Sequence, residues 1–244
     1  MYRSHSAQDS SPEAHEFYGI IKRLGDILQR RPEIDWSEDR KWCAEVLEEL
    51  ARGCEKSLLL EEKLSGCRYL RGGDEHLLVD YGAGEEPPRV YKVTYGENFG
   101  CKSRFIAADP DLTGKHFHAE VQSDPLFYLN RWVYLNSITG YQTRYEGILP
   151  PPVDGTLPLI CVSQKRLPEI NPKDEKTIEA ALSLYGYVRI SKDTYLEKDS
   201  HILLTDAAPR NVRINEGLPA LFDVIAEKAS ERVVTWAEER GLLG

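Results

Sequence analysis

The stretch that decides the fold of this chain is Leu203-Leu204-Thr205-Asp206-Ala207-Ala208-Pro209-Arg210-Asn211-Val212-Arg213-Ile214, followed by Leu221-Phe222-Asp223-Val224-Ile225. Asn211 comes five positions after Asp206, and Asp223 comes twelve positions after Asn211, with short β-like apolar runs around them. In phosphoryl transfer, one carboxylate orients the attacking hydroxyl and accepts its proton, while an amide and a second carboxylate hold Mg²⁺. The spacing is compatible with that chemistry, although each residue taken singly is also typical of a turn or a strand end.

A strand lysine and a glycine pair precede this stretch. Residues 89–95 alternate as a strand does, which puts Val90, Lys92 and Thr94 on one face. A lysine buried there needs an anionic partner such as a nucleotide phosphate, whereas one on an edge strand reaches water. The pair Gly72-Gly73 either lets the backbone approach phosphates or forms an ordinary hairpin turn.

Taken in this order, the motifs resemble those of the protein-kinase-like superfamily. More narrowly, the chain resembles the serine/threonine/tyrosine-kinase-like domain of the polyvalent proteins of phages and mobile elements. The resemblance covers roughly residues 70–226, about two-thirds of the chain. Its pieces are Gly72-Gly73-Asp74-Glu75-His76, Val90-Tyr91-Lys92-Val93-Thr94, Tyr128-Leu129-Asn130-Arg131, Thr143-Arg144-Tyr145-Glu146-Gly147, Val162-Ser163-Gln164, Gly186-Tyr187, residues 206–212 and Phe222-Asp223-Val224-Ile225.

The resemblance implies an α+β, two-lobe protein-kinase-like fold with a mainly antiparallel N-lobe sheet, an abbreviated C-lobe and an N-terminal helical extension. It implies ATP and Mg²⁺ as cofactors and an unidentified hydroxyl as phosphoryl acceptor. Asp206 and Lys92 would be catalytic, and Asn211 and Asp223 would hold the metal. The remaining nucleotide contacts would come from Gly72 and Gly73 and from a hinge containing Gln164, Lys165 and Arg166.

The chain departs from the kinase pattern at three places, and the first of them, a missing helix carboxylate, leaves a second interpretation open. The expected helix 125–138 contains no Glu or Asp to pair with Lys92, so Asn130 or the upstream Glu120 is expected to take that place. Leu204-Thr205-Asp206 replaces the usual His-Arg-Asp, and Asp223-Val224-Ile225 replaces Asp-Phe-Gly. The alternative is therefore a catalytically silent pseudokinase or a nucleotide-binding interaction module.

Composition limits the partners. The chain has 244 residues, 41% hydrophobic and 29% charged, with a net charge of −9, which argues against a general nucleic-acid or membrane-surface binder. No apolar stretch approaches the ~20 residues of a membrane span. Five cysteines without a C-x-x-C pair favour reduced thiols in a cytoplasmic protein.

The polar residues 1–12 are expected to be a disordered tail, and periodicity predicts a helical extension at 13–66. The resemblance then implies an N-lobe (67–162) and a C-lobe (163–244). The extension contains one helix ending at Pro32 and a second apolar stripe from Asp35 to Leu59, and it packs on the first lobe or on a protein partner. The N-lobe has strands within 67–81, 89–95, 143–149 and 157–162, an irregular insertion at 96–123 with surface histidines His116 and His118, and the helix 125–138. The C-lobe has helices at 171–184 and 228–240 and short strands at 187–190, 194–197 and 201–204.

Overall fold

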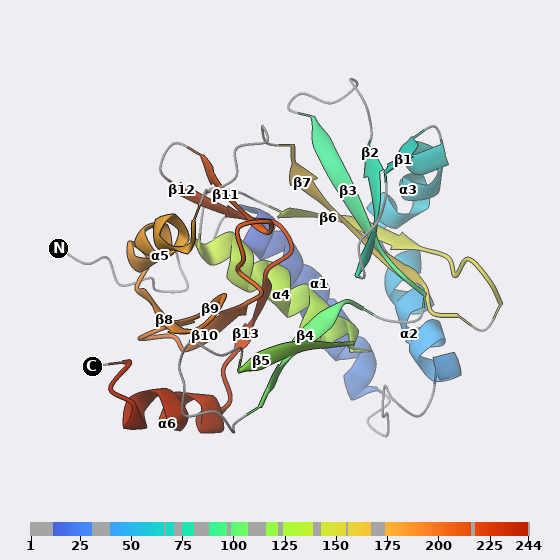
Figure 1. Cartoon of the computed structure of the whole chain (residues 1–244). Helices are drawn as coiled ribbons and strands as arrows, with labels where there is room; N and C mark the ends of the chain where they lie inside the picture. Colours follow the sequence, from blue (N-terminus) through green and yellow to red (C-terminus); the bar gives the residue numbers. More distant parts are fainter. Residues whose placement is uncertain are drawn as a thin grey trace. The chain divides into compact units, whose positions relative to one another are not determined.

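The computed structural model describes residues 12–30, 40–65, 67–70, 75–80, 88–96, 99–106, 116–121, 124–138, 143–154, 156–166, 174–215 and 218–243. Helices and strands are interspersed along the chain (Figure 1), and the strand pairings among these residues are antiparallel. The chain is therefore an α+β protein with antiparallel sheets, as the sequence predicted. The predicted tail lies outside the described residues except for Pro12, which begins the first helix.

Contacts divide the chain into two units. The first unit comprises Met1–Gly100, Ser123–Ser137 and Gln142–Arg166, and the second comprises Cys101–Gln122, Ile138–Tyr141 and Leu167–Gly244. This division differs from the boundaries that the sequence suggested, since residues 163–166, assigned there to the C-lobe, belong to the first unit. The N-terminal helices group with the first sheet, and residues 101–122 group with the second unit because β4 contacts β13.

The first unit is built on a five-stranded sheet with the order β1-β2-β3-β7-β6. Its strands are β1 (Arg68–Leu70), β2 (His76–Asp80), β3 (Arg89–Thr94), β6 (Thr143–Leu149) and β7 (Leu159–Lys165). The strand predictions within 67–81, at 89–95 and at 143–149 are confirmed. β3 is the central strand, where Lys92 pairs with Leu78 on one side and Val162 on the other.

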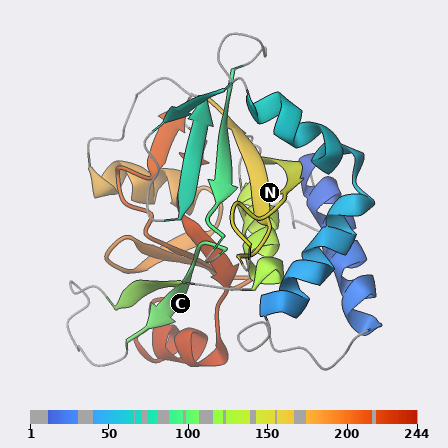
Figure 2. The ribbon, with the colours of Figure 1, turned by 90° about the vertical axis from the view of Figure 1, so that its right-hand side faces the viewer.

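Three N-terminal helices pack beside this sheet (Figure 2). These helices, α1 (Pro12–Gln29), α2 (Arg40–Arg52) and α3 (Glu55–Ser65), all contact β6. Leu60 and Leu64 of α3 are buried against Val79, Tyr91 and Val93 of the sheet. The helical extension therefore packs on the first sheet, and the face of β3 opposite to Tyr91 carries Lys92.

The second apolar stripe of the extension was predicted to be one helix, but it forms two, α2 and α3. Residues Gly53 and Cys54 separate α2 from α3. The break places Ser57 at β6, where its Oγ accepts a hydrogen bond of 2.9 Å from the Ile148 N–H. A side chain at Gly147, whose φ is +139°, would lie 2.9 Å from the Ser57 Cα, so the close approach of helix and strand requires glycine there.

Helix α4 (Pro125–Ile138) begins and ends where the sequence predicted. Asp124 caps it, because its Oδ1 accepts a 2.8 Å hydrogen bond from the Leu126 N–H. Burial nevertheless raises the pKa of the Asp124 carboxyl above its ordinary value. Tyr128, Leu129 and Trp132 of this helix are buried.

The second unit contains a four-stranded sheet with the order β13-β10-β9-β8. Its strands are β8 (Tyr187–Ser191), β9 (Thr194–Glu197), β10 (Ile202–Thr205) and β13 (Ile225–Lys228), and a separate hairpin joins β11 (Val212–Asn215) to β12 (Leu218–Leu221). The predicted strands at 187–190, 194–197 and 201–204 are confirmed to within a residue. Helix α5 (Glu175–Ser183) follows its N-cap Asp174, and Gly186, with φ +83°, follows its end.

The start of the terminal helix was predicted wrongly. Lys228 belongs to β13, where it pairs with Ile202, and α6 (Glu231–Glu239) begins three residues later. Pairing with Ile202 extends β13 as far as Lys228, and local periodicity does not reveal this partner.

The insertion at 96–123, predicted to be irregular, contains a regular hairpin of β4 (Cys101–Phe105) and β5 (Phe117–Val121). His118 is exposed as expected, but the prediction for His116 is wrong, because only 2% of its surface is accessible. The His116 Nδ1 lies 2.9 Å from the Ser191 Oγ, and its ring centroid lies 5.4 Å from that of Trp236.

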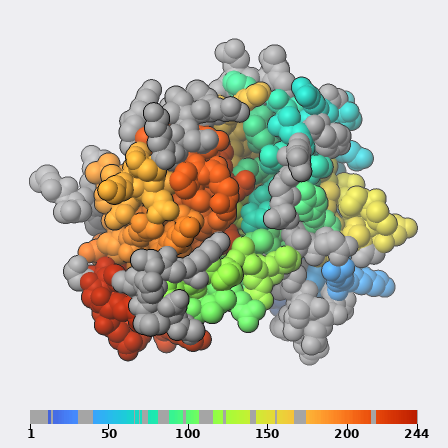
Figure 3. All heavy atoms as spheres, in the orientation of Figure 1, coloured from blue at the N-terminus to red at the C-terminus, as the bar shows by residue number. Residues whose placement is uncertain are grey.

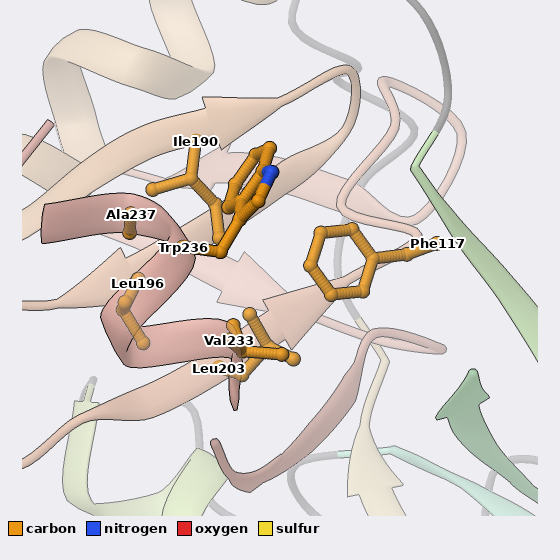
Figure 4. Packing of buried hydrophobic residues seen from close by; sticks show 7 residues of the cluster. All are labelled: Phe117, Ile190, Leu196, Leu203, Val233, Trp236 and Ala237. Carbon is orange, nitrogen blue, oxygen red and sulfur yellow. The ribbon is translucent and has the colours of Figure 1, made fainter. Parts of the chain in front are cut away.

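A hydrophobic core holds the second unit together (Figure 4). Trp236 of α6 lies beside Ile190 of β8, and the ring of Phe117 from β5 points toward it. The core joins the hairpin, the sheet and the last helix; its buried members are Phe117, Ile190, Leu196, Leu203, Val233, Trp236 and Ala237.

The turn between β6 and β7 lies on the surface (yellow in Figure 3), and Val153 there is 64% exposed.

All five cysteines are free thiols. Among the helices of the described ranges, none has the length and apolar character needed to cross a membrane.

Candidate functional site

Asp206 follows the last residue of β10 and has an unusual backbone. Its φ is +56°, in the left-handed region, which aspartate tolerates better than most residues because its short side chain can bond locally. The Asn211 Nδ2 donates to the backbone oxygen of Asp206 at 2.9 Å and to its Oδ2 at 2.7 Å. Residues 206–211 therefore form a compact loop closed by one carboxamide.

The second oxygen of the Asp206 carboxylate is also held. The Arg210 Nη2 lies 2.5 Å from the Asp206 Oδ1, and the Arg210 side chain is 67% exposed. The ion pair contributes little to stability, because an exposed pair is screened by water. Its effect is to orient the carboxylate, since both oxygens now have a fixed donor.

Asn211 connects this loop to Asp223. Only 8% of Asn211 is exposed, its N–H donates to the Ala208 oxygen at 2.8 Å, and its own backbone oxygen accepts from the Phe222 N–H at 3.0 Å. The hairpin that begins with Val212 paired to Leu221 thus returns Phe222 to Asn211, and Asp223 is the next residue along the chain. The three oxygen-bearing residues singled out in the sequence lie at the same end of this hairpin.

Lys92, the candidate phosphate contact, is 3% exposed on β3 of the first unit. Its Nζ lies 5.5 Å from the ring centroid of Trp132 on α4, so lysine and helix lie on the same side of the sheet. The prediction that Lys92 points away from the face of Tyr91 and Val93 agrees with the packing of those two residues on α3.

The substitutes predicted for the missing helix carboxylate have other contacts. The Asn130 Nδ2 donates to the Leu126 oxygen of its own helix at 2.9 Å. Glu120 lies on β5 in the second unit, 3.9 Å from the Lys102 Nζ, and is 45% exposed.

A buried ion pair that sequence reasoning missed lies near Lys92. The Arg131 Nη1 of α4 contacts both carboxylate oxygens of Glu75, at 3.0 and 2.9 Å. Arg131 is 1% exposed and the Glu75 side chain 13%. The available signal was a single arginine in the buried face of an otherwise uncharged helix, but its partner is 56 positions away in the sequence.

His76 and Tyr128 form a second polar contact in the same region. The His76 Nε2 lies 2.9 Å from the Tyr128 hydroxyl oxygen, and the His76 Nδ1 lies 3.8 Å from the Glu75 Oε2. Burial raises the pKa of the Tyr128 hydroxyl well above its ordinary value, with the positive charge of Arg131 acting in the opposite direction. Tyr128 is therefore a neutral hydrogen-bonding partner at physiological pH.

The predicted hinge lies in a different setting from the one expected. Strand β7 continues to Lys165 rather than ending at Val162, because Gln164 and Lys165 find partners in Val90 and Arg89 of β3. The Arg166 N–H donates to the Pro88 oxygen at 2.8 Å. Gln164 thus lies within the sheet, and the contact of Gln164, Lys165 and Arg166 with a nucleotide stays a prediction.

Gly72 and Gly73, the other predicted nucleotide contacts, lie outside the described residues.

Comparison with family models, curated proteins and solved structures finds no match to this chain. The site therefore has to be interpreted from its own chemistry.

Proposed function

We propose that this protein is an ATP- and Mg²⁺-dependent phosphotransferase with a protein-kinase-like, two-lobe architecture. The observation on which the proposal rests is the loop from Asp206 to Asn211 together with the hairpin that returns to Asp223. One carboxylate is held in a fixed orientation beside a carboxamide, and a second carboxylate, that of Asp223, comes two residues after the return strand β12 ends.

The three residues suit distinct roles. Asp206 would orient the acceptor hydroxyl and accept its proton. The amide nitrogen of Asn211 is bonded to Asp206, so its carboxamide oxygen is the end suited to Mg²⁺, a hard cation that binds oxygen ligands. Asp223 would be the second protein ligand. Bound Mg²⁺ would neutralise the charge on the nucleotide phosphates.

The first unit supports the same proposal through its topology. Three strands, then a helix, then two more strands complete one antiparallel sheet, and Lys92 lies on the third strand. A lysine at that place contacts the α- and β-phosphates in protein kinases. Lys92 would have that role here, with the acceptor of the γ-phosphate unidentified.

One observation favours a second candidate, a nucleotide-binding protein without catalytic activity. Helix α4 (Pro125–Ile138) contains neither Asp nor Glu, so the usual helix carboxylate that pairs with the lysine is missing. Both candidates bind ATP, and they differ in turnover.

Thermal melting with and without ATP and Mg²⁺, combined with transfer from labelled ATP to the protein, tests the proposal. ATP at 100 times its Kd should stabilise the wild type by ~2.7 kcal/mol, a shift of a few degrees. Asp223→Ala should lose the Mg²⁺-dependent part of the shift. Asp206→Asn should keep the shift, because asparagine tolerates the left-handed backbone, but reduce transfer by about 10²- to 10⁴-fold.

Asp199→Asn, a change at an exposed turn aspartate of the same unit, is the matched control and should behave as wild type. A shift without turnover in the wild type would favour the silent candidate. No shift in the wild type would reject both.

A further inference from the structure

Two buried cationic side chains, one from the first sheet and one from α4, contact the indole ring of Trp132. The Lys92 Nζ lies 5.5 Å from the ring centroid of Trp132, and the Arg131 Cζ lies 5.2 Å from the same centroid. Lys92 comes from the central strand, whereas Arg131 and Trp132 are consecutive residues of α4. The position of Trp132 relative to β3 thus affects both cations.

Glu75 connects this group to the sheet. It directly precedes β2, and both of its carboxylate oxygens accept from the Arg131 Nη1. β2 is also the strand that pairs with β3, with Leu78 opposite Lys92. An ion pair from Glu75 to Arg131 therefore fixes α4 to the strand beside Lys92.

Stability alone does not explain such a pair. Removing two charges from water costs free energy that their attraction often fails to recover, and apolar side chains of similar volume are frequently as stable. The buried His76–Tyr128 hydrogen bond of 2.9 Å joins the same strand to the same helix. Two polar contacts, one from the start of β2 and one from the residue before it, specify the position of α4 more strictly than apolar packing does.

From this arrangement we infer that Glu75 and Arg131 are positioning residues for Lys92. In the usual kinase pair the lysine is on the sheet and the glutamate on the helix. Here the charges are reversed, because the cation is on the helix and the carboxylate directly precedes a strand of the sheet. The inference rests on the proposed function, in which Lys92 contacts phosphate. Arg131 holds α4, Trp132 then restricts the lysine side chain, and the ammonium is kept in one orientation. A lysine side chain loses much rotamer freedom on binding, so an orientation fixed beforehand strengthens phosphate binding.

The test is a double-mutant cycle read out by ATP·Mg²⁺ affinity and, separately, by melting temperature. Glu75→Gln removes a charge at nearly constant shape, Arg131→Gln removes the guanidinium and shortens the side chain, and Arg131→Lys keeps the charge but loses the planar guanidinium. Each should weaken ATP·Mg²⁺ binding by roughly tenfold, the lower end of the effect found for groups that orient metal-ligating side chains. The control Glu49→Gln breaks the exposed Arg30–Glu49 pair of 2.6 Å in the same unit and should leave affinity unchanged.

Each variant is then combined with Lys92→Met. If Glu75 and Arg131 act through Lys92, their substitution should cause no further loss of affinity in the Lys92→Met background, while melting temperature still falls. Equal losses of affinity in both backgrounds would overturn the inference, because they indicate a general structural role. Should Arg131→Gln fail to fold, Arg131→Lys and Glu75→Gln complete the cycle.

The two proposals fail differently. Wild-type binding that is weakened by Lys92→Met but unaffected by Glu75→Gln and Arg131→Lys overturns only the positioning role. The absence of ATP·Mg²⁺ binding by the wild type overturns the proposed function and this inference with it.

Discussion

At the scale of single residues, the site depends on a backbone conformation that most side chains avoid. Asp206 has φ +56°, a conformation that costs most L-residues roughly 1–2 kcal/mol. The hydrogen bonds from Asn211 offset this cost, and together with the exposed ion pair to Arg210 they orient the carboxylate. Strain retained at a polar loop is the pattern expected where geometry serves chemistry.

Asn211→Ala tests this arrangement. It removes both hydrogen bonds to Asp206, so the free energy of unfolding should fall by about 1–3 kcal/mol and phosphoryl transfer should be lost. Urea unfolding and the labelled-ATP assay measure the two effects.

Asn136→Ala is the matched control, because Asn136 is also buried and makes two bonds with the Thr143 backbone, at 2.9 and 2.8 Å. It should lose similar stability and keep transfer where it is folded. Equal loss of transfer in the two variants would contradict a specific role for Asn211.

The sequence indicated Asp206, Asn211 and Asp223 because their connection is local, through a short loop and one hairpin. It did not indicate the contact of Glu75 with Arg131. Nothing in a helix pattern reveals which of many distant carboxylates will meet a buried arginine, because that choice is made by strand register and helix position.

At the scale of elements, the contact of α3 with β6 shows how closely the helical extension is fitted to the first sheet. The Ser57 backbone lies where a side chain of residue 147 would be, and the Ser57 Oγ bonds the next residue of the strand. The extension is thus part of the first unit rather than a loosely attached segment.

Gly147→Ala should therefore destabilise the protein by about 2–4 kcal/mol, from overpacking against backbone and from the positive φ of +139°. Gly19→Ala in α1 is the control, since no atom lies within 4 Å of the added methyl group and alanine favours helix. It should stabilise by up to ~1 kcal/mol. Chemical denaturation followed by circular dichroism measures the free energy of unfolding of both variants. An unchanged value for Gly147→Ala would show that α3 can move away from β6 without loss of stability.

Elements with local signals were predictable. Asp124-Pro125 begins α4, and Thr143–Leu149 forms β6 as expected. The break between α2 and α3, the β4–β5 hairpin and the extra residues of β7 were not. Each of these depends on a partner strand or helix elsewhere, which extends or interrupts a segment beyond what its own periodicity indicates.

At the scale of the whole molecule, buried tyrosines link stability to alkaline pH. Burial raises the pKa of Tyr195 from 10.0 to about 12, and raises those of Tyr128, Tyr145 and Tyr187 further. The native state keeps these protons above pH 10, whereas the unfolded chain releases them. The unfolded state then binds fewer protons, so stability falls as the pH rises.

We expect the urea midpoint to decline from about pH 10 upward, with phenolate absorbance rising as the protein unfolds. Tyr195→Phe removes one such phenol and should make the decline between pH 10 and about 12 shallower. If all thirteen tyrosines titrated near pH 10 in the folded protein, the buried hydroxyls would have to be accessible to water, contrary to the structure.

The sequence by itself determined the α+β class, most helices and strands, and the close relation of Asp206, Asn211 and Asp223. These features follow from periodicity, capping and turn chemistry, which act over a few residues. Only the tertiary structure decided that His116 is buried, that Gln164 lies within the sheet, and that Arg131 of α4 meets Glu75. Burial, register and ion pairing depend on which distant segments pack together, and that is settled by the free energy of the whole fold.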